Sequence, residues 1–194
     1  NVGVNILSNL GQLLRHQERL DESEQLLREA VELSRKTLPA MDTERAFCTT
    51  NLGLTLEARG EFAEAEALLR ESLDLRRKAL PAGHQDLASS PRELAYVLQL
   101  ERRPAEAEPL FREALKIRQD RLKPDHLWIA QTQKSLGECL VKQAKYADAE
   151  PFLQSSFATY LAVRGPSDAN TARALKSLES LYAAWGKPEK VEEF

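Results

Sequence analysis

The chain has 194 residues, with 27 Lys and Arg against 30 Asp and Glu, so its formal net charge is −3. A hydrophobic fraction of 42% excludes wholesale disorder, and no apolar run reaches the roughly 18 residues that a membrane span needs. The slightly acidic balance argues against a general nucleic-acid binder, and the few glycines and aromatic residues favour a helical fold.

Residues of the same type recur every 42 positions, and positions separated by multiples of 42 are called one register below. One register holds only leucines: Leu10, Leu52, Leu94, Leu136 and Leu178. Another holds only glutamates: Glu24, Glu66, Glu108 and Glu150. This period predicts a single repeat array, with repeats at about 1–42, 43–84, 85–126 and 127–168 and a partial fifth at 169–194.

Each repeat is predicted to form two amphipathic helices, called A and B. In the second repeat, apolar residues around Leu52 and Leu56 recur at spacings of three and four, and Gly60 ends this helix A. A second apolar stripe begins at Phe62 and defines helix B. Pro81 and Gly83 then close the repeat, since proline cannot continue a helix and glycine permits a reversal of the chain.

Acidic and basic residues four positions apart recur on the predicted B helices, in the pairs Glu24/Arg28, Glu66/Arg70 and Glu108/Arg112. This orientation supports a helix by about 0.2–0.5 kcal/mol per pair. The pattern therefore predicts a solvated helix face and not a catalytic carboxylate pair.

Pro91 falls inside the expected A helix of the third repeat. The run Ser90-Pro91-Arg92-Glu93 has the order of an N-cap, a proline at the first helical position and a capping-box glutamate. We therefore expect this helix to start late or to bend at Pro91.

The second repeat, with its Leu-Gly pair, its glycine before an aromatic residue, its Ala-Glu pair and its loop histidine followed by Leu-Ala, resembles a tetratricopeptide repeat (TPR) of the 42-residue, kinesin-light-chain-like type. The loop signature recurs at His84 and His126. This resemblance covers essentially the whole chain. It implies an all-α solenoid of antiparallel helix pairs in a right-handed superhelix, in which A helices line a concave groove and B helices form the outer surface.

The fifth repeat is predicted to begin its B helix near Pro188, too close to Phe194 for a full helix. Because terminal repeats usually need a polar capping helix, we expect the protein to continue beyond Phe194. An apolar face left uncovered there would also permit self-association through the incomplete repeat.

Each of the two tryptophans stands in a register where later or earlier repeats carry polar residues: Glu44, Asp86 and Asn170 for Trp128, and Gln17, Arg59, Glu101 and Gln143 for Trp185. Tryptophan is favoured at binding hot spots, so either residue is a candidate partner contact. Packing between repeats is the alternative explanation for both.

The sequence contains no catalytic motif and no histidine cluster at metal-ligand spacing, so we expect a non-catalytic protein without metal or cofactor. His84 and His126 are predicted to make helix-entry contacts. Cys48 and Cys139 lie two repeats apart and are predicted to be free thiols, Cys139 in the core. Free thiols favour a cytoplasmic location.

In TPR proteins generally, peptide-contacting residues come from five positions of each A helix. Carried over by register, with the groove asparagine of the light-chain type, the candidates are Asn9, Arg15, Asn51, Arg92, Tyr96, Lys134, Glu138, Lys142, Arg173 and Lys176. Six basic groove residues against Glu57 and Glu138 give this surface a predicted charge of +4. We therefore predict binding of an acidic or carboxylate-bearing peptide; ordinary solvated lysines are the alternative.

Two functions follow from the resemblance. The first is a protein–protein interaction scaffold that binds a partner peptide or protein in the groove, with no role for nucleic acid or membrane. The second is a regulatory or localising tail of a larger signalling enzyme, because the closing run Ala184-Trp185-Gly186-Lys187-Pro188-Glu189-Lys190 also resembles TPR tails of bacterial Ser/Thr protein kinases.

Overall fold

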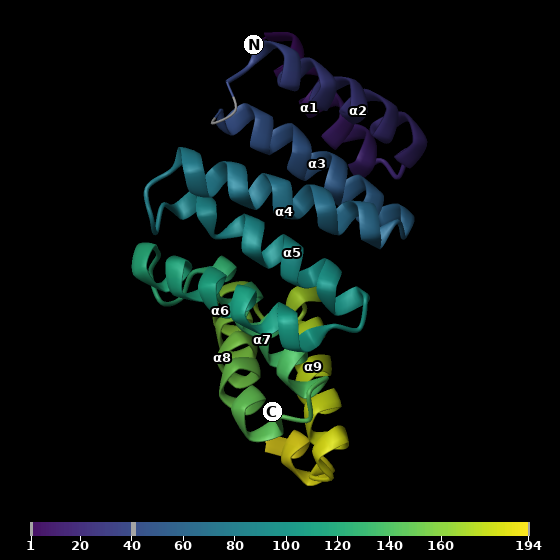
Figure 1. Ribbon diagram of the computed structural model, residues 1–194. Helices are drawn as coiled ribbons and strands as arrows, with labels where there is room; N and C mark the ends of the chain where they lie inside the picture. Colours follow the sequence, from purple (N-terminus) through teal and green to yellow (C-terminus); the bar gives the residue numbers. More distant parts are fainter. Residues whose placement is uncertain (1, 40–41, 194) are drawn as a thin grey trace. The chain divides into compact units, whose positions relative to one another are not determined.

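The computed structural model describes residues 2–39 and 42–193, and this part of the chain is helical without strands (Figure 1). It divides into two compact units, unit 1 at Asn1–Glu101 and unit 2 at Arg102–Phe194. Unit 1 contains α1 (Val2–His16), α2 (Leu20–Thr37), α3 (Thr43–Arg59), α4 (Phe62–Ala79), the 3-10 helix η1 (Gln85–Leu87) and α5 (Ser89–Leu100). Unit 2 contains α6 (Pro104–Arg121), α7 (Leu127–Val141), α8 (Tyr146–Arg164), α9 (Ala169–Trp185) and the 3-10 helix η2 (Pro188–Glu193).

The helix ends follow from local sequence. The carboxylate of Asp42 accepts a hydrogen bond from Glu44 N–H at 2.7 Å, and Asp168 does the same for Asn170 at 2.8 Å, so both A helices begin behind an aspartate N-cap. Helix α3 ends at Gly60, which takes the left-handed conformation (φ 82°) that glycine adopts without steric cost. The predicted A–B division at Gly60 is confirmed.

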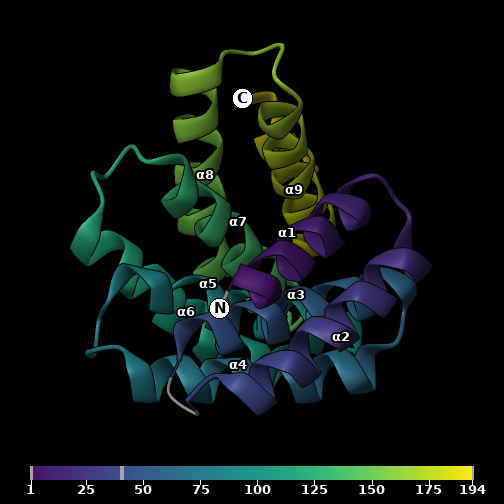
Figure 2. The ribbon, with the colours of Figure 1, turned by 90° about the horizontal axis from the view of Figure 1, so that it is seen from above.

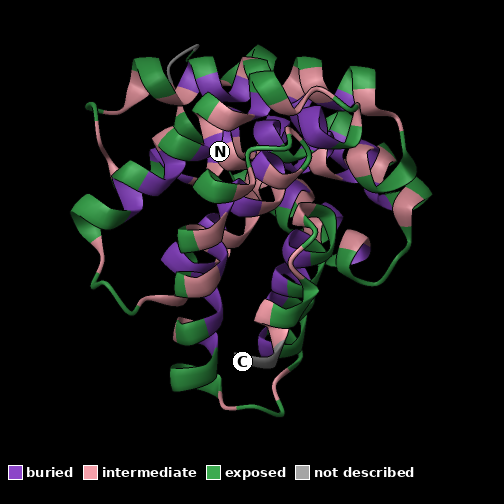
Figure 3. Ribbon diagram, turned by 90° about the horizontal axis from the view of Figure 1, so that it is seen from below, coloured by how far each residue is buried: buried purple, intermediate pink, exposed green. Residues whose placement is uncertain are grey.

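Neighbouring helices pack in chain order within each unit. In unit 1, α2 lies against both α1 and α3, and α4 lies against both α3 and α5 (Figure 2). In unit 2, α7 lies between α6 and α8, and α8 also packs on α9. Along the helices, buried residues and exposed residues fall on different sides (Figure 3). The A helices also contact each other, α1 with α3 and α3 with α5 in unit 1, and α7 with α9 in unit 2.

The Leu-Gly pair has a packing role. A Cβ atom at Gly137 would lie 2.5 Å from Cγ of Leu153, closer than carbon atoms approach without bonding. Gly11 stands in the same relation to Leu27. Glycine at this register therefore lets the A and B helices of one repeat approach closely.

Helix α5 begins late, as Pro91 predicts. Its first residue, Ser89, lies four residues later in the register than the first residues of α3 and α7, and η1 occupies the intervening turn. The predicted N-cap is wrong, however, because Ala88 caps the helix and Ser90 lies inside its first turn. Pro91 is tolerated there because the first N–H groups of a helix have no acceptor within the helix.

Candidate functional site

The predicted groove residues lie on A helices or directly after one, in both units. Asn9 and Arg15 lie on α1, Asn51 on α3, and Arg92 and Tyr96 on α5. In unit 2, Lys134 and Glu138 lie on α7, Lys142 directly follows it, and Arg173 and Lys176 lie on α9. Because α1, α3 and α5 pack in sequence in unit 1 and α7 packs on α9 in unit 2, each unit carries its own part of the predicted groove.

Arg15 forms the centre of a charged cluster in unit 1. Its half-buried guanidinium is attracted by the carboxylates of Glu57 on α3 and Glu93 on α5, while its Nε atom is buried without a hydrogen-bond partner among the described residues. Burial lowers the pKa of Arg15, and the two carboxylates oppose this shift. Burial raises the pKa of Glu57, and Arg15 opposes that shift in turn.

Two buried amides in unit 1 also hold unused hydrogen-bond donors. Asn51 is 3% exposed and Gln99, on α5, is 5% exposed. Neither Nδ2 of Asn51 nor Nε2 of Gln99 has an acceptor within the described part of the chain. A buried donor without an acceptor costs about 1–3 kcal/mol, so such groups are uncommon in cores and each one requires a specific explanation.

The charges of unit 2 are arranged differently. Lys134 Nζ lies 2.6 Å from Oε1 of Glu138, and Oγ of Ser177 on α9 donates to the same oxygen at 2.7 Å. Lys134 and Glu138 therefore largely neutralise each other. Lys142, Arg173 and Lys176 are exposed and supply the remaining positive charge of the predicted groove in this unit.

The sequence prediction of the groove charge omitted Glu93. This residue stands in the register of Asn9 and Asn51, and its carboxylate acts on Arg15. Adding Glu93 lowers the predicted groove charge from +4 to +3. The position of Glu93 in the register of Asn9 and Asn51 was the sequence signal that it belongs to the groove.

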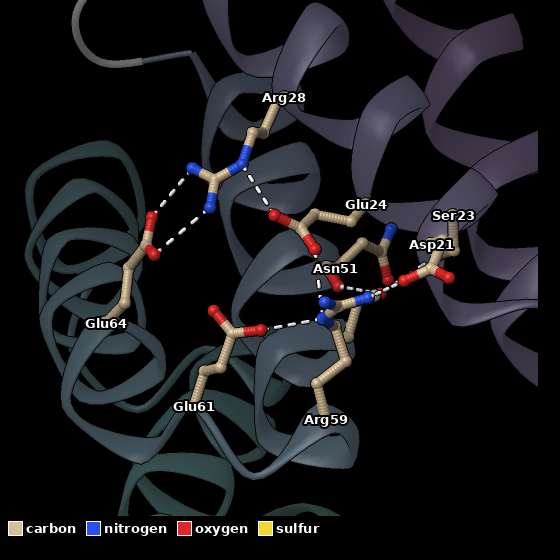
Figure 4. A network of polar contacts seen from close by, with 9 residues as sticks. Asp21, Ser23, Glu24, Arg28, Asn51, Arg59, Glu61 and Glu64 are labelled. Atoms are coloured by element: carbon tan, nitrogen blue, oxygen red, sulfur yellow. Dashed lines mark hydrogen bonds and ion pairs between the residues drawn. The ribbon is translucent and has the colours of Figure 1, made fainter.

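Ion pairs also connect successive repeats on the B-helix side of each unit. In unit 1, Arg59 lies 3.0 Å from Glu24 and 2.7 Å from Glu61, and it also pairs with Asp21 (Figure 4). Arg28 bonds Glu24 on its own helix at 2.9 Å and Glu64 on α4 at 2.7 Å. These contacts join α2 to both helices of the next repeat.

The same arrangement recurs in unit 2 around Glu108. This carboxylate accepts hydrogen bonds from Arg112 at 2.9 Å, Lys145 at 2.7 Å and Gln143 at 3.0 Å. The predicted pairs at a spacing of four are confirmed, but the side chains of Glu24, Glu66 and Glu108 are only 15–18% exposed. The interpretation as a solvated face is wrong for Glu24 and Glu108, because each of these two carboxylates lies in the junction between two repeats.

We expect Glu108→Gln to change how stability depends on pH. The hydrogen bond from Lys145, with those from Arg112 and Gln143, lowers the pKa of Glu108 from 4.5 to about 2. A lowered pKa stabilises the fold above the unfolded-state value, and this contribution disappears as pH falls towards 2. In urea denaturation, Glu108→Gln should lower the free energy of unfolding by about 1–2 kcal/mol at pH 7 and should hardly change it near pH 2.

The matched control for this experiment is Glu179→Gln, which removes one carboxylate from the exposed side of α9. Glu179→Gln should lower the free energy of unfolding by less than about 0.5 kcal/mol at neutral pH. An equal effect of the two substitutions at pH 7 would contradict the role of Glu108 in joining repeats.

The two loop histidines make the predicted helix-entry contacts. Nδ1 of His84 accepts a hydrogen bond from Asp86 N–H at 3.3 Å, and Nδ1 of His126 accepts one from Trp128 N–H at 3.1 Å. Cys48 and Cys139 are free, buried thiols, as predicted. Within residues 2–39 and 42–193 there is no group of three or more His, Cys, Asp or Glu side chains suited to a metal ion, and none of the helices described is long and apolar enough to cross a membrane.

The two tryptophans have different surroundings. The Trp185 ring is half-buried and stacks on Tyr146 of α8 with 6.2 Å between ring centroids, which favours the packing explanation. Trp128 is 57% exposed. The guanidinium of Arg118 lies 5.8 Å from the centroid of its ring. Packing leaves most of this indole in solvent, so Trp128 keeps its candidacy as a partner contact.

Known structures share this arrangement of helices. The nearly identical TPR-like repeats assigned to a kinesin light chain of Podosopora anserina superimpose with a TM-score of 0.85 at 21% identity, covering 98% of this chain and 90% of that chain. BtubC (BKLC) from P. vanneervenii gives 0.84 at 20% identity, with 98% and 76% covered. MamA from Desulfovibrio magneticus RS-1 gives 0.71 at 14% identity, with 100% and 91% covered.

Sequence comparison identifies the family directly. No curated protein matches the chain. The family model for the tetratricopeptide repeat matches residues 4–78 and 86–162, which is most of the 194 residues. Together with the 42-residue period and the paired helices, this match shows that the chain belongs to the tetratricopeptide repeat family.

Proposed function

We propose that the chain is a non-catalytic protein–protein interaction scaffold that binds an acidic peptide segment of its partner against the A helices. The observation that carries this proposal is a set of three exposed cations among the predicted groove residues of unit 2. Lys142, Arg173 and Lys176 are exposed there, whereas the acidic groove residue Glu138 is already bound by Lys134 and Ser177.

Electrostatics favours a carboxylate-rich ligand at this surface. Arg173 and Lys176 lie three residues apart on α9, so their side chains project from one side of the helix. Exposed cations on one surface raise the association rate of an acidic segment and hold it through charge-assisted hydrogen bonds. Because these contacts are solvent-exposed, affinity should fall as salt is added.

We expect charge reversal on α9 to weaken this binding at least tenfold. Arg173→Glu/Lys176→Glu replaces two attractive charges with repulsive ones and should raise the Kd of a fluorescein-labelled decaglutamate peptide by that factor in an anisotropy titration. Lys134→Glu should raise the Kd less, because Lys134 is already paired with Glu138. The affinity of the unmodified protein should also fall between about 50 and about 200 mM NaCl.

The control is Lys116→Glu, a reversal of an exposed lysine on the B helix α6. It changes the net charge of unit 2 without altering an A helix, so the Kd should change less than about twofold. The single variant Lys176→Glu is compared with Lys116→Glu, because each reverses one charge. If the two weaken binding equally, the peptide is held by general charge attraction and not by a groove site. Unchanged binding in the α9 double variant would refute the proposal.

The alternative function, a tail of a signalling enzyme, rests on the segment from Ala184 to Lys190. In unit 2 this segment has structural contacts of its own, since Trp185 stacks on Tyr146 and Lys190 Nζ lies 2.7 Å from Glu150. Packing thus accounts for these residues, and the structure adds no support for the alternative. We also propose a cytoplasmic location, because the two buried thiols suit a reducing compartment.

A further inference from the structure

The N-caps at the starts of α3, η1, α7 and α9 occupy one register of the repeat. This register holds Asp42, His84, His126 and Asp168, each 42 residues apart. All four residues have an extended backbone, with φ between −82° and −61°. Each side chain accepts a hydrogen bond from the N–H two residues later, at 2.7 to 3.3 Å. The fold thus places carboxylates at the outer two of these positions and imidazoles at the inner two.

The two kinds of N-cap respond differently to acid. An aspartate carboxylate keeps its charge down to about pH 4, whereas histidine changes charge between about pH 5 and about pH 8. An imidazole accepts through Nδ1 only while it is neutral, because protonation puts a hydrogen on that nitrogen. A protonated cap also places a positive charge at the positive end of the helix dipole. Mild acid therefore removes an imidazole cap and leaves a carboxylate cap in place.

His84 has a compensating carboxylate. Its Nδ1 atom lies 3.7 Å from Oδ2 of Asp86, so a protonated ring gains an ion pair with the residue whose N–H it released. The segment that His84 opens is the three-residue 3-10 helix η1, in which few N–H groups depend on the cap. Protonation of His84 therefore changes the stability of unit 1 little.

His126 lacks this compensation. Trp128 stands in the register of Asp86, and the first turn of α7 contains no acidic residue. The helix that His126 opens, from Leu127 to Val141, is a full A helix. Loss of this cap therefore leaves N–H groups at the start of α7 without an acceptor, and no carboxylate of that turn balances the new charge.

The charged groups around His126 are mainly positive. Arg118 of α6 donates to the carbonyl oxygen of Trp128 at 2.7 Å, and the ring of Trp128 lies 5.0 Å from the imidazole, centroid to centroid. Lys123 and Asp125 precede His126 in the turn and are both exposed. Asp125 is the single acid among these three groups, and water screens its attraction for an imidazolium. A proton on His126 is therefore not offset by its charged neighbours.

We propose that His126 makes the start of α7 open in mild acid. Protonation of the imidazole deprives Trp128 N–H of its acceptor, and the first turn of α7 separates from its cap. The capped start requires the neutral ring, whereas an unfolded chain takes up the proton freely. This contribution to stability therefore disappears as pH falls from about 7.5 to about 5.5. The inference is independent of the proposed peptide binding.

Substitution of each inner histidine by aspartate tests the inference, because aspartate is the residue that this register carries at Asp42 and Asp168. Thermal unfolding is followed by circular dichroism at about pH 7.5 and about pH 5.5. His126→Asp should raise the midpoint of unfolding above that of the unmodified protein by about 2–4 °C more at the lower pH than at the higher one. His84→Asp is the matched control, since it changes the net charge identically. Its effect on the midpoint should differ between the two pH values by less than about 1 °C.

NMR spectroscopy follows the contact itself in the unmodified protein. The amide proton of Trp128 should move upfield as His126 is titrated, because an amide proton moves in this direction when it loses its hydrogen bond. The amide proton of Asn170, which bonds Asp168 at 2.8 Å, should stay in place. His126→Asn keeps an uncharged acceptor at the cap and should abolish the movement of the Trp128 signal. A Trp128 signal that stays in place while His126 titrates, or equal pH effects of the two aspartate substitutions, would overturn the proposal.

Discussion

Replacing Tyr182 with alanine is expected to lower the free energy of unfolding of unit 2 by about 3–5 kcal/mol. Tyr182 is 0% exposed and is among the largest fully buried side chains of the described residues. Its hydroxyl accepts a hydrogen bond from Nε2 of Gln154 and donates one to Oε1 of Glu150, both at 3.0 Å. Removing the ring leaves a cavity between α8 and α9, and it leaves Gln154 without this partner.

The measurement is urea denaturation followed by circular dichroism, together with limited proteolysis. Because α9 packs on α7 and α8 within unit 2, loss of Tyr182 should loosen α9 first. Cleavage between Ala169 and Trp185 should therefore become faster than cleavage in α7. The same variant should also bind the decaglutamate probe more weakly, since Arg173 and Lys176 both lie on α9.

Tyr182→Leu is the matched control, because leucine stands in this register as Leu14, Leu56, Leu98 and Leu140. It keeps most of the buried apolar surface and removes only the hydroxyl contacts, so the loss should be about 1–2 kcal/mol. A loss below about 1 kcal/mol for the alanine variant would contradict the role of Tyr182 in holding α9. Equal losses for both variants would assign the effect to the hydrogen bonds.

Much of this local structure could be predicted from the 42-residue period. Tyr182 stands in a leucine register, so its burial follows from register alone, and the late start of α5 follows from Pro91 and the chemistry of helix starts. The contacts of His84 and His126 also followed from their equivalent loop positions. These features depend on interactions within a helix or on positions that every repeat shares.

The carboxylate contacts between repeats could not be predicted in the same way. Glu108 meets Gln143 and Lys145, which are 35 and 37 residues away in the chain. Which side chains converge on Glu108 depends on how tightly one repeat packs on the next, and a one-dimensional pattern does not contain that distance. The exposure of Leu10 and Leu13 on α1, 44% and 52%, does not follow from the register either. A register predicts a packing surface, whereas burial also requires a neighbour to cover it.

The candidate groove lies between these two cases. Its residues could be placed on A helices from the register, but their pairing depends on which neighbours approach. Lys134 was counted as an available cation and instead lies 2.6 Å from Glu138. Arg15 was counted in the same way, although the carboxylates of Glu57 and Glu93 act on it. The net charge of a surface is thus easier to predict than the charge that remains available to a ligand.

Arg15→Met is expected to lower the free energy of unfolding by about 1–3 kcal/mol at pH 7, since it leaves two carboxylates without their buried counter-charge. Burial already raises the pKa of Glu57, and Arg15 opposes that shift. Without Arg15 the pKa of Glu57 should rise further. A raised carboxyl pKa means that the folded state binds more protons, so stability falls as pH rises through the interval between the unfolded and folded values. The loss should therefore be largest at neutral pH and shrink towards pH 4.

A double-variant cycle separates this electrostatic effect from lost packing. Arg15→Met/Glu57→Gln removes the charge that Arg15 balances, so it should be more stable at pH 7 than Arg15→Met alone by about 1 kcal/mol. The cycle is measured by urea denaturation at pH 7 and pH 4. A pH-independent loss, or a double variant no more stable than the single one, would show that Arg15 acts by packing its aliphatic stem. In that case Glu57 would not neutralise Arg15. Arg15 would then join the cations of unit 2 as a candidate for binding an acidic ligand.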